Sequence, residues 1–184
     1  DKGVKAGVFE ADDVGPVLAS FSINMDSRQV DLKFSETVQF SKFDVTKVTL
    51  FHGADRVELS DGTIITNTVG VNVKFTLKSD DFDKITLKKF ATSKDNVKID
   101  AAGGVIEDMA GNTAVAATNV ACVSHIADAT GPQLNSFSVD MDKLTLTLVF
   151  SETVLASTAK AEGLTLYSKV TGGTVKHKLR TEFT

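Results

Sequence analysis

The chain has 184 residues, a net charge of −4 and 42% hydrophobic residues, a composition typical of a globular protein. Its acidic balance argues against nucleic acid as a partner because phosphate binding needs a basic surface, and no apolar run approaches the ~18 residues of a membrane span. The single cysteine, Cys122, excludes an intrachain disulfide and a cysteine-based zinc site.

Hydrophobic and polar residues alternate along most of the chain, a period of two that predicts β-strands with one buried face. In chain order, we expect strands at 17–24, 29–36, 46–52, 62–67, 70–78, 95–100 and 113–123. About seven strands with few helical stretches predict an all-β fold, an antiparallel β-sandwich. The expected core residues are the apolar members of these runs: Phe21, Leu32, Phe34, Leu50, Phe75 and Leu77.

One segment, 79–93, departs from this alternation. Phe82 and Ile85 fall there at helical spacing, and Asp80 and Asp81 precede them as candidate N-caps. We therefore expect a short helix or 3₁₀ segment near 80–90 that crosses between the sheets.

The chain also repeats itself. Residues 15–51 return at 131–167, an offset of 116 residues without a gap, with 17 identities over 37 positions. A period this long is the size of a small domain, which predicts a tandem array of domains. The expected organisation is the last strand and linker of a preceding repeat at 1–14, a complete repeat at 15–128, and the first half of the next repeat at 129–184.

Half a sandwich exposes an apolar face and unpaired strand edges. Two explanations remain open for the incomplete parts. Either the parent chain continues beyond them, or another copy of the same protein supplies the missing strands. In the second case, residues 4–11 of one copy would pair with the open sheet of another and form a filament.

Three sequence features resemble the bacterial Ig-like repeats of S-layer proteins, adhesins and other large extracellular proteins. They are the Gly15-Pro16 opening, the LKFSETV run at 32–38, and the Asp-Met-Ala-Gly-Asn turn at 108–112. The resemblance implies tandem Ig-like sandwiches at the cell surface or outside the cell. It also implies a spacer, adhesive or structural role without shared catalytic residues.

Carboxylates gather where we expect one repeat to meet the next. Antiparallel pairing returns the second strand to the end where the first begins, which places Glu36 beside the preceding linker. In an Ig-like sandwich, the 108–112 turn lies at the same end. Calcium takes six to eight oxygen ligands, often carboxylates, so we expect an interdomain calcium site. The candidate ligands at the two junctions are Glu10, Asp12, Asp13, Glu36, Asp108 and Asn112, and then Asp128 and Glu152. Alternatively, the turn residues simply bond their own backbone.

The sequence contains no nucleophile elbow, P-loop, dinucleotide-binding glycine pattern or His-Glu-x-x-His motif. We therefore expect a non-enzymatic extracellular structural module, part of a tandem Ig-like rod or filament. Its partners would be neighbouring repeats and other copies of the same protein. The alternatives are an adhesin-type binding module for a glycan or protein, with the 52–61 loop as its candidate contact, and a spacer attached to an enzyme.

Overall fold

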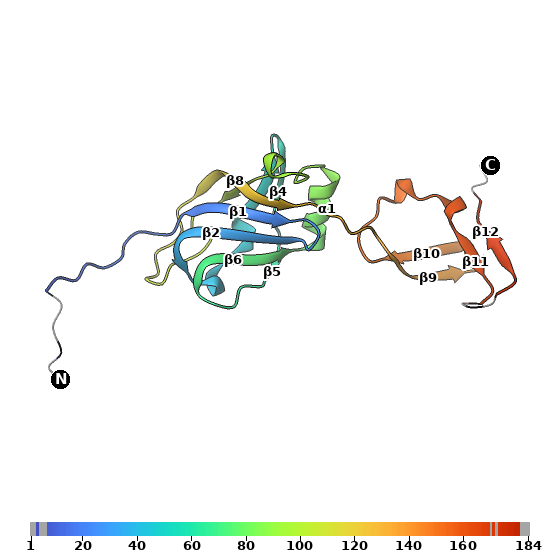
Figure 1. Cartoon of the computed structure of the whole chain (residues 1–184), viewed down its shortest axis with the longest axis horizontal. Helices are drawn as coiled ribbons and strands as arrows, with labels where there is room; N and C mark the ends of the chain where they lie inside the picture. Colours follow the sequence, from blue (N-terminus) through green and yellow to red (C-terminus); the bar gives the residue numbers. More distant parts are fainter. Residues whose placement is uncertain (1–2, 4–6, 170, 172, 181–184) are drawn as a thin grey trace. The chain divides into compact units, whose positions relative to one another are not determined.

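The computed structural model describes residues 3, 7–169, 171 and 173–180 (Figure 1). The chain divides into two compact units, unit 1 at Asp1–Gly131 and unit 2 at Pro132–Thr184. The described residues contain twelve β-strands and one α-helix, in agreement with the predicted all-β class. Among the helices in this part of the chain, none has the length and hydropathy needed to span a membrane.

In the described part of unit 1, eight strands form one continuous sheet in the order β4-β3-β7-β8-β1-β2-β6-β5. In chain order the strands are β1 Leu18–Asn24, β2 Gln29–Val38, β3 Val48–His52, β4 Asp55–Glu58, β5 Gly62–Ile64, β6 Gly70–Leu77, β7 Lys98–Ala101 and β8 Ala117–Ile126. Short 3₁₀ segments, Phe40–Lys42, Val45–Lys47 and Lys94–Asn96, connect some of them.

Strand β8 changes its pairing partner halfway along. Its first part, up to Ala121, pairs antiparallel with β7. Its second part, from Cys122 to Ile126, pairs parallel with β1. The two halves of the sheet therefore share one hydrophobic core. The six predicted core residues all belong to it and are at most 3% exposed, which confirms the predicted buried faces.

The predicted helix is present as α1, Ser79–Leu87, with Phe82 and Ile85 buried. The expectation that Asp80 or Asp81 caps it was wrong, because the N-cap is Lys78 and no side chain caps the helix. Asp81 lies inside the first turn and is fully buried. Its carboxylate instead accepts hydrogen bonds from the backbone N–H and hydroxyl of Ser60, at 2.7 and 2.9 Å.

The 52–61 segment, expected as a loop, contains strand β4. Gly53 adopts a positive φ of 58° and lets the chain turn directly from β3 into β4. Val57 then pairs with Leu50 and is buried. Sequence alternation missed this strand because Val57 is its only apolar residue.

The last strand of unit 1 begins at Ala117 instead of residue 113. The residues just before it pair elsewhere: Ala114 donates its backbone N–H to Ile106 O at 2.8 Å, and Val115 donates to Pro16 O at 3.0 Å. The second of these bonds joins the incoming chain to the segment that precedes β8. The incoming residues 8–17 form no strand, and residues 4–6 lie outside the described residues.

Unit 2 contains the hairpin of β9 Leu134–Asp140 and β10 Thr145–Phe150, and a second pair, β11 Thr165–Tyr167 with β12 Lys176–Lys178. The β9–β10 register matches β1–β2 residue for residue. Leu134 pairs with Phe150 as Leu18 pairs with Phe34, and both hairpins are irregular at this point. This confirms that Phe34 and Phe150 occupy the same position in their hairpins.

Candidate cation site at the proximal end of unit 1

The proximal end of unit 1, where the chain comes in at residues 12–17, is built from three segments. Because β1 and β2 are antiparallel, the end of β2 lies beside the start of β1. Val38 at the end of β2 forms a β-bridge with Asp108, which draws in the turn 108–112. Gln39 strengthens this junction by donating its backbone N–H to Glu107 O at 2.9 Å and its amide to Asp108 O at 2.6 Å.

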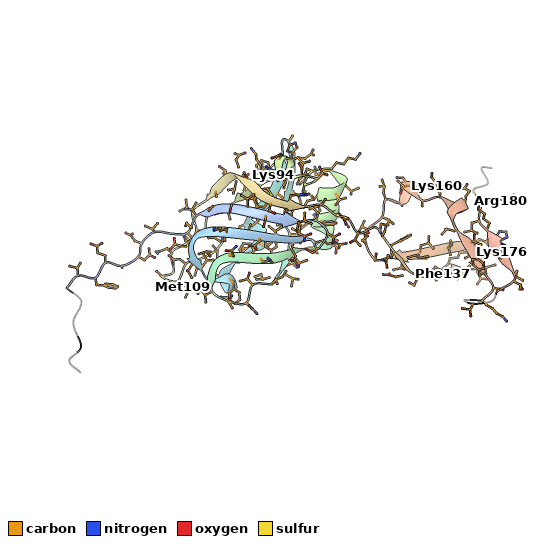
Figure 2. All side chains as sticks on the ribbon, viewed as in Figure 1. Lys94, Met109, Phe137, Lys160, Lys176 and Arg180 are labelled. Atoms are coloured by element: carbon orange, nitrogen blue, oxygen red, sulfur yellow. The ribbon has the colours of Figure 1, made fainter. Side chains whose placement is uncertain are left out.

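Asp108 organises the turn through its own carboxylate and is only 1% exposed. Its Oδ1 accepts the backbone N–H groups of Ala110 and Asn112, both at 2.8 Å, and its Oδ2 accepts the Asn112 side-chain amide at 2.8 Å. Burial acts to raise the pKa of Asp108, but these hydrogen bonds outweigh it and hold the pKa below its usual value. Asp108 is therefore a carboxylate at neutral pH. The neighbouring Met109 side chain is exposed at this end of the unit (Figure 2).

Asn112 also holds the incoming linker. Besides its bond to Asp108, its side-chain amide donates to Asp12 O at 3.1 Å, a contact between residues 100 positions apart. The linker residue Val14 donates its backbone N–H to Asp12 Oδ1 at 3.2 Å. The linker is thus fixed to the turn just before β1 begins.

Three carboxylates converge at this place. Single carboxylate oxygens of Asp12, Glu36 and Asp108 all lie within 4.8 Å of one another. Burial raises the pKa of Glu36, and the charges of Asp12 and Asp108 raise it further. Such an arrangement suits a hard cation, because calcium binds several carboxylate and carbonyl oxygens at about 2.3–2.6 Å.

Four of the predicted ligands, Asp12, Glu36, Asp108 and Asn112, therefore meet at the proximal end. Glu10 and Asp13 are exposed and lie outside the group of three. Of the three acidic linker residues, only Asp12 contributes a carboxylate to the group.

The second predicted pair, Asp128 and Glu152, is divided between the two units. Asp128 Oδ1 accepts the Thr130 backbone N–H at 3.2 Å. Glu152 has a buried Oε1 without a hydrogen-bond partner among the described residues. Both residues stand 116 positions after members of the first group, Asp12 and Glu36. A site at the second junction stays a prediction.

The distal end of unit 1, where the chain leaves, is held by a residue that the sequence analysis missed. Asp26, in the turn between β1 and β2, accepts the backbone N–H groups of Ala129 and Thr130 at 3.1 and 3.0 Å. The pKa of Asp26 is lowered mainly by a hydrogen bond from the Thr130 side chain, and next by the hydrogen bond from the Ala129 backbone. Its position in a Met-Asp turn that recurs at 141–142 was the available signal.

Comparison of the chain with protein-family models, curated proteins and solved structures gave no match.

The cysteine and the three histidines lie in environments typical of side chains with a structural role. Cys122 is buried in the core, where burial raises the pKa of its thiol, and its Sγ donates to Ser124 O at 3.0 Å. His125 places Nε2 2.8 Å from Ala91 O, while His52 and His177 are exposed on separate strands. A buried cysteine of this kind is inert compared with a catalytic thiolate.

Proposed function

We propose that this chain is a non-enzymatic structural part of an extracellular tandem array of Ig-like β-sandwiches, which extends or presents other material away from a cell. The observation that carries this proposal is the parallel pairing of the first and last strands of unit 1. Phe21 pairs with Cys122, and Asn24 pairs with Ile126 at the other end of the same ladder.

Parallel pairing of terminal strands decides where the chain comes in and goes out. If two adjacent strands run in the same direction, the start of one and the end of the other lie at opposite ends of the ladder. The seven residues of β1 separate these ends by six steps, about 20 Å at 3.3 Å per residue. A unit built in this way passes the chain from one end to the other, as an end-to-end array requires (Figure 1).

Both linkers are also held at these ends. Asn112 binds the incoming linker at Asp12 O, and Asp26 binds the outgoing linker at Ala129 and Thr130. Only a few residues separate each anchor from the strand that follows. Short, anchored linkers favour a semi-rigid rod over freely jointed beads. The sandwich interpretation is supported by the shared core and by the change of partner along β8.

The alternative of an adhesin-type binding module loses its main candidate, because the 52–61 segment contains a tight hairpin instead of a long loop. A spacer attached to an enzyme would have the same architecture as the rod. Both alternatives are separated from the proposal by assembly into rods or filaments. Antibodies raised against this chain, used in immuno-electron microscopy of the source cells, should label rods or filaments outside the cell. Labelling confined to the cell interior would contradict the proposal.

A second proposal concerns the three carboxylates. We infer that a divalent cation, with calcium as the best match, binds Asp12, Glu36 and Asp108 and stiffens the proximal linker. Support comes from their convergence within 4.8 Å and from the raised pKa of Glu36. The cation would compensate the repulsion that raises this pKa, and would join the linker, β2 and the 108–112 turn.

The test compares melting temperatures with calcium and with chelator. A ligand that binds only the folded state stabilises it by mass action. Glu36→Gln is the informative variant, because Asp108→Ala would also remove the hydrogen bonds that form the turn. Glu10→Gln, in the incoming linker and outside the group of three carboxylates, is its matched control. Calcium should raise the melting temperature of the parent chain and of Glu10→Gln but not of Glu36→Gln. If the parent chain has the same melting temperature with and without calcium, the cation proposal is refuted and the array proposal is unaffected.

A further inference from the structure

The outer face of the sheet in unit 1 carries rows of polar side chains that cross four adjacent strands. Strands β8, β1, β2 and β6 lie side by side (Figure 1). Their registers place four residues opposite one another in one row: Ser124, Ser22, Asp31 and Lys74. The next row comprises Ile126, Asn24, Gln29 and Thr76. Neighbouring strands lie about 4.8 Å apart, so a row across four strands is about 14 Å long.

Two hollows lie along these rows and meet at an ion pair. Asp31 pairs with Lys74 at 3.5 Å and accepts a hydrogen bond from the Asn72 side-chain amide at 3.0 Å. A hollow of about 150 Å³ reaches from this pair toward β8, and its walls include Ser22, Asn24, Gln29, Ser124 and Ile126. A hollow of about 440 Å³ reaches from the same pair to the 65–70 loop, and its walls include Thr66, Asn67, Thr68, Val71 and Asn72.

The loop that closes the larger hollow is fixed to the sheet. Thr66 Oγ1 accepts the backbone N–H of Lys74 at 2.7 Å, and Ile65 donates its own backbone N–H to Lys74 O at 2.8 Å. The wall of the larger hollow is therefore held by the same residue that forms the ion pair. We call the two hollows together the outer-face groove.

The polar residues of this groove are not what the strands themselves require. Aspartate and asparagine are disfavoured in strands, yet Asp31 lies in the internal strand β2 and Asn72 in β6. In the matching hairpin of unit 2, the positions of Gln29 and Asp31 are occupied by Thr145 and Thr147. The hairpin therefore forms with ordinary strand residues at both positions. Local departures of this kind are typical of functional sites.

The groups that line the groove match the hydroxyl groups of a sugar. Serine and threonine hydroxyls and side-chain amides both donate and accept, and a carboxylate accepts from two neighbouring hydroxyls. The two charges in the groove, on Asp31 and Lys74, cancel, which favours an uncharged ligand. Ile126 in the smaller hollow and Val71 in the larger one are exposed and can contact the C–H faces of sugar rings.

We propose that the outer-face groove of unit 1 binds an uncharged glycan chain that lies across the strands. The groove presents side chains and not a free strand edge, so it does not suit a peptide that would add to the sheet. It is separate from the 52–61 segment, and the inference depends on unit 1 alone and not on the proposed array. None of the described residues that line the groove is aromatic, so we expect weak binding to a single unit.

Nuclear magnetic resonance titration of the full chain tests this inference and detects weak binding. The probes are three uncharged oligosaccharides, cellohexaose, maltohexaose and chitohexaose, with an oligogalacturonate of the same length as the charged comparison. At least one uncharged probe should shift the side-chain amide resonances of Gln29 and Asn72 saturably. The backbone amides of Thr145 and Thr147, the equivalent positions in unit 2, should not shift, and the galacturonate should not bind the groove.

Chain variants locate the binding. Asp31→Thr introduces the residue that unit 2 has at this position, and it should weaken binding at least about tenfold because a charged acceptor is lost. Gln29→Thr is a second variant of the same kind and should weaken binding about threefold. Lys33→Val, which also introduces the unit 2 residue, is the matched control, since Lys33 lies on β2 but lines neither hollow. It should bind as the parent chain does.

Three results would overturn the inference. The first is the absence of a saturable shift at Gln29 and Asn72 with all three uncharged probes. The second is equal affinity of the parent chain and of the folded Asp31→Thr and Gln29→Thr variants. The third is tighter binding of the galacturonate than of every uncharged probe, which would show that the groove selects charge.

Discussion

Phe34 and Phe150 occupy the same hairpin position but differ in burial. Replacing each by alanine therefore shows how much of the stability effect comes from burial of the side chain and not from its position in the hairpin. Phe34 is 2% exposed in the core of unit 1, and Phe150 is only partly buried in unit 2. Removing a buried phenylalanine side chain costs about 3–5 kcal/mol. A domain has about 5–15 kcal/mol of stability, so unit 1 of Phe34→Ala should stay folded but open far more often.

Cys122 provides the assay, because it is the single cysteine and is 7% exposed in the core of unit 1. A thiol reagent reaches it only when unit 1 opens, and the labelling rate follows the population of open molecules when closing is fast. Phe34→Ala should accelerate labelling roughly 150-fold to 5,000-fold. Phe150→Ala should change the labelling rate by less than about twofold, since Phe150 belongs to the other compact unit and shares no core with Cys122.

The dependence of the labelling rate on urea concentration distinguishes opening of the whole unit from fraying of β8. Only opening of the whole unit exposes a large surface, so only it gives a steep dependence. An acceleration below about fivefold for Phe34→Ala, equivalent to ~1 kcal/mol, would show that this side chain is not packed as described. An equal acceleration by Phe150→Ala would refute the assignment of the two residues to different surroundings.

Three further predictions concern carboxylates. Without a cation, Glu36→Gln should raise the melting temperature at pH 7 above that of Glu10→Gln, because the folded state holds the pKa of Glu36 above its ordinary 4.5 and its ionisation opposes folding. Burial raises the pKa of Asp81, but bonds from Ser60 and then Lys84 lower it overall. Its stabilisation is therefore present above its ordinary pKa of 3.8 and is lost as pH falls through the lower folded value. Asp81→Asn should cost about 1–3 kcal/mol in urea denaturation at pH 7 and flatten that acid dependence. Asp26→Ala should release the linker at 127–131, seen as faster proteolysis there with an unchanged unfolding midpoint for unit 1; unchanged proteolysis would show that Asp26 is not the anchor.

Alternation was sufficient to predict the strands with several inward apolar residues. β2 and β6 each carry at least three, and their predicted bounds differ from the observed ones by two residues or fewer. Strand β4 was missed because its pairing depends on the turn at Gly53 and on a single buried side chain, Val57. The start of β8 was misplaced because residues 114 and 115 alternate as a strand would but bond to Ile106 and Pro16.

The residues of the candidate site were predicted mainly from the expected strand topology and only to a small extent from sequence motifs. Antiparallel pairing alone brings Glu36 back to the linker, and the 108–112 turn meets it through the Val38–Asp108 bridge. Which linker carboxylate faces the turn could not be predicted, because Glu10, Asp12 and Asp13 have similar chemistry. The structure distinguishes Asp12 through the bond between its carbonyl and Asn112, a contact across 100 residues that no local pattern contains.

The parallel ladder of β1 and β8 has a mechanical consequence for an array. Tension applied through the two linkers pulls β1 and β8 in opposite directions along their common axis. All hydrogen bonds of the ladder are then loaded in shear at the same time, whereas antiparallel terminal strands would be peeled apart one bond after another. The anchors at Asn112 and Asp26 lie outside the ladder, so in such an array the load would reach them before it reaches the ladder. In such an array, unit 1 would resist stretching along the direction in which its chain runs.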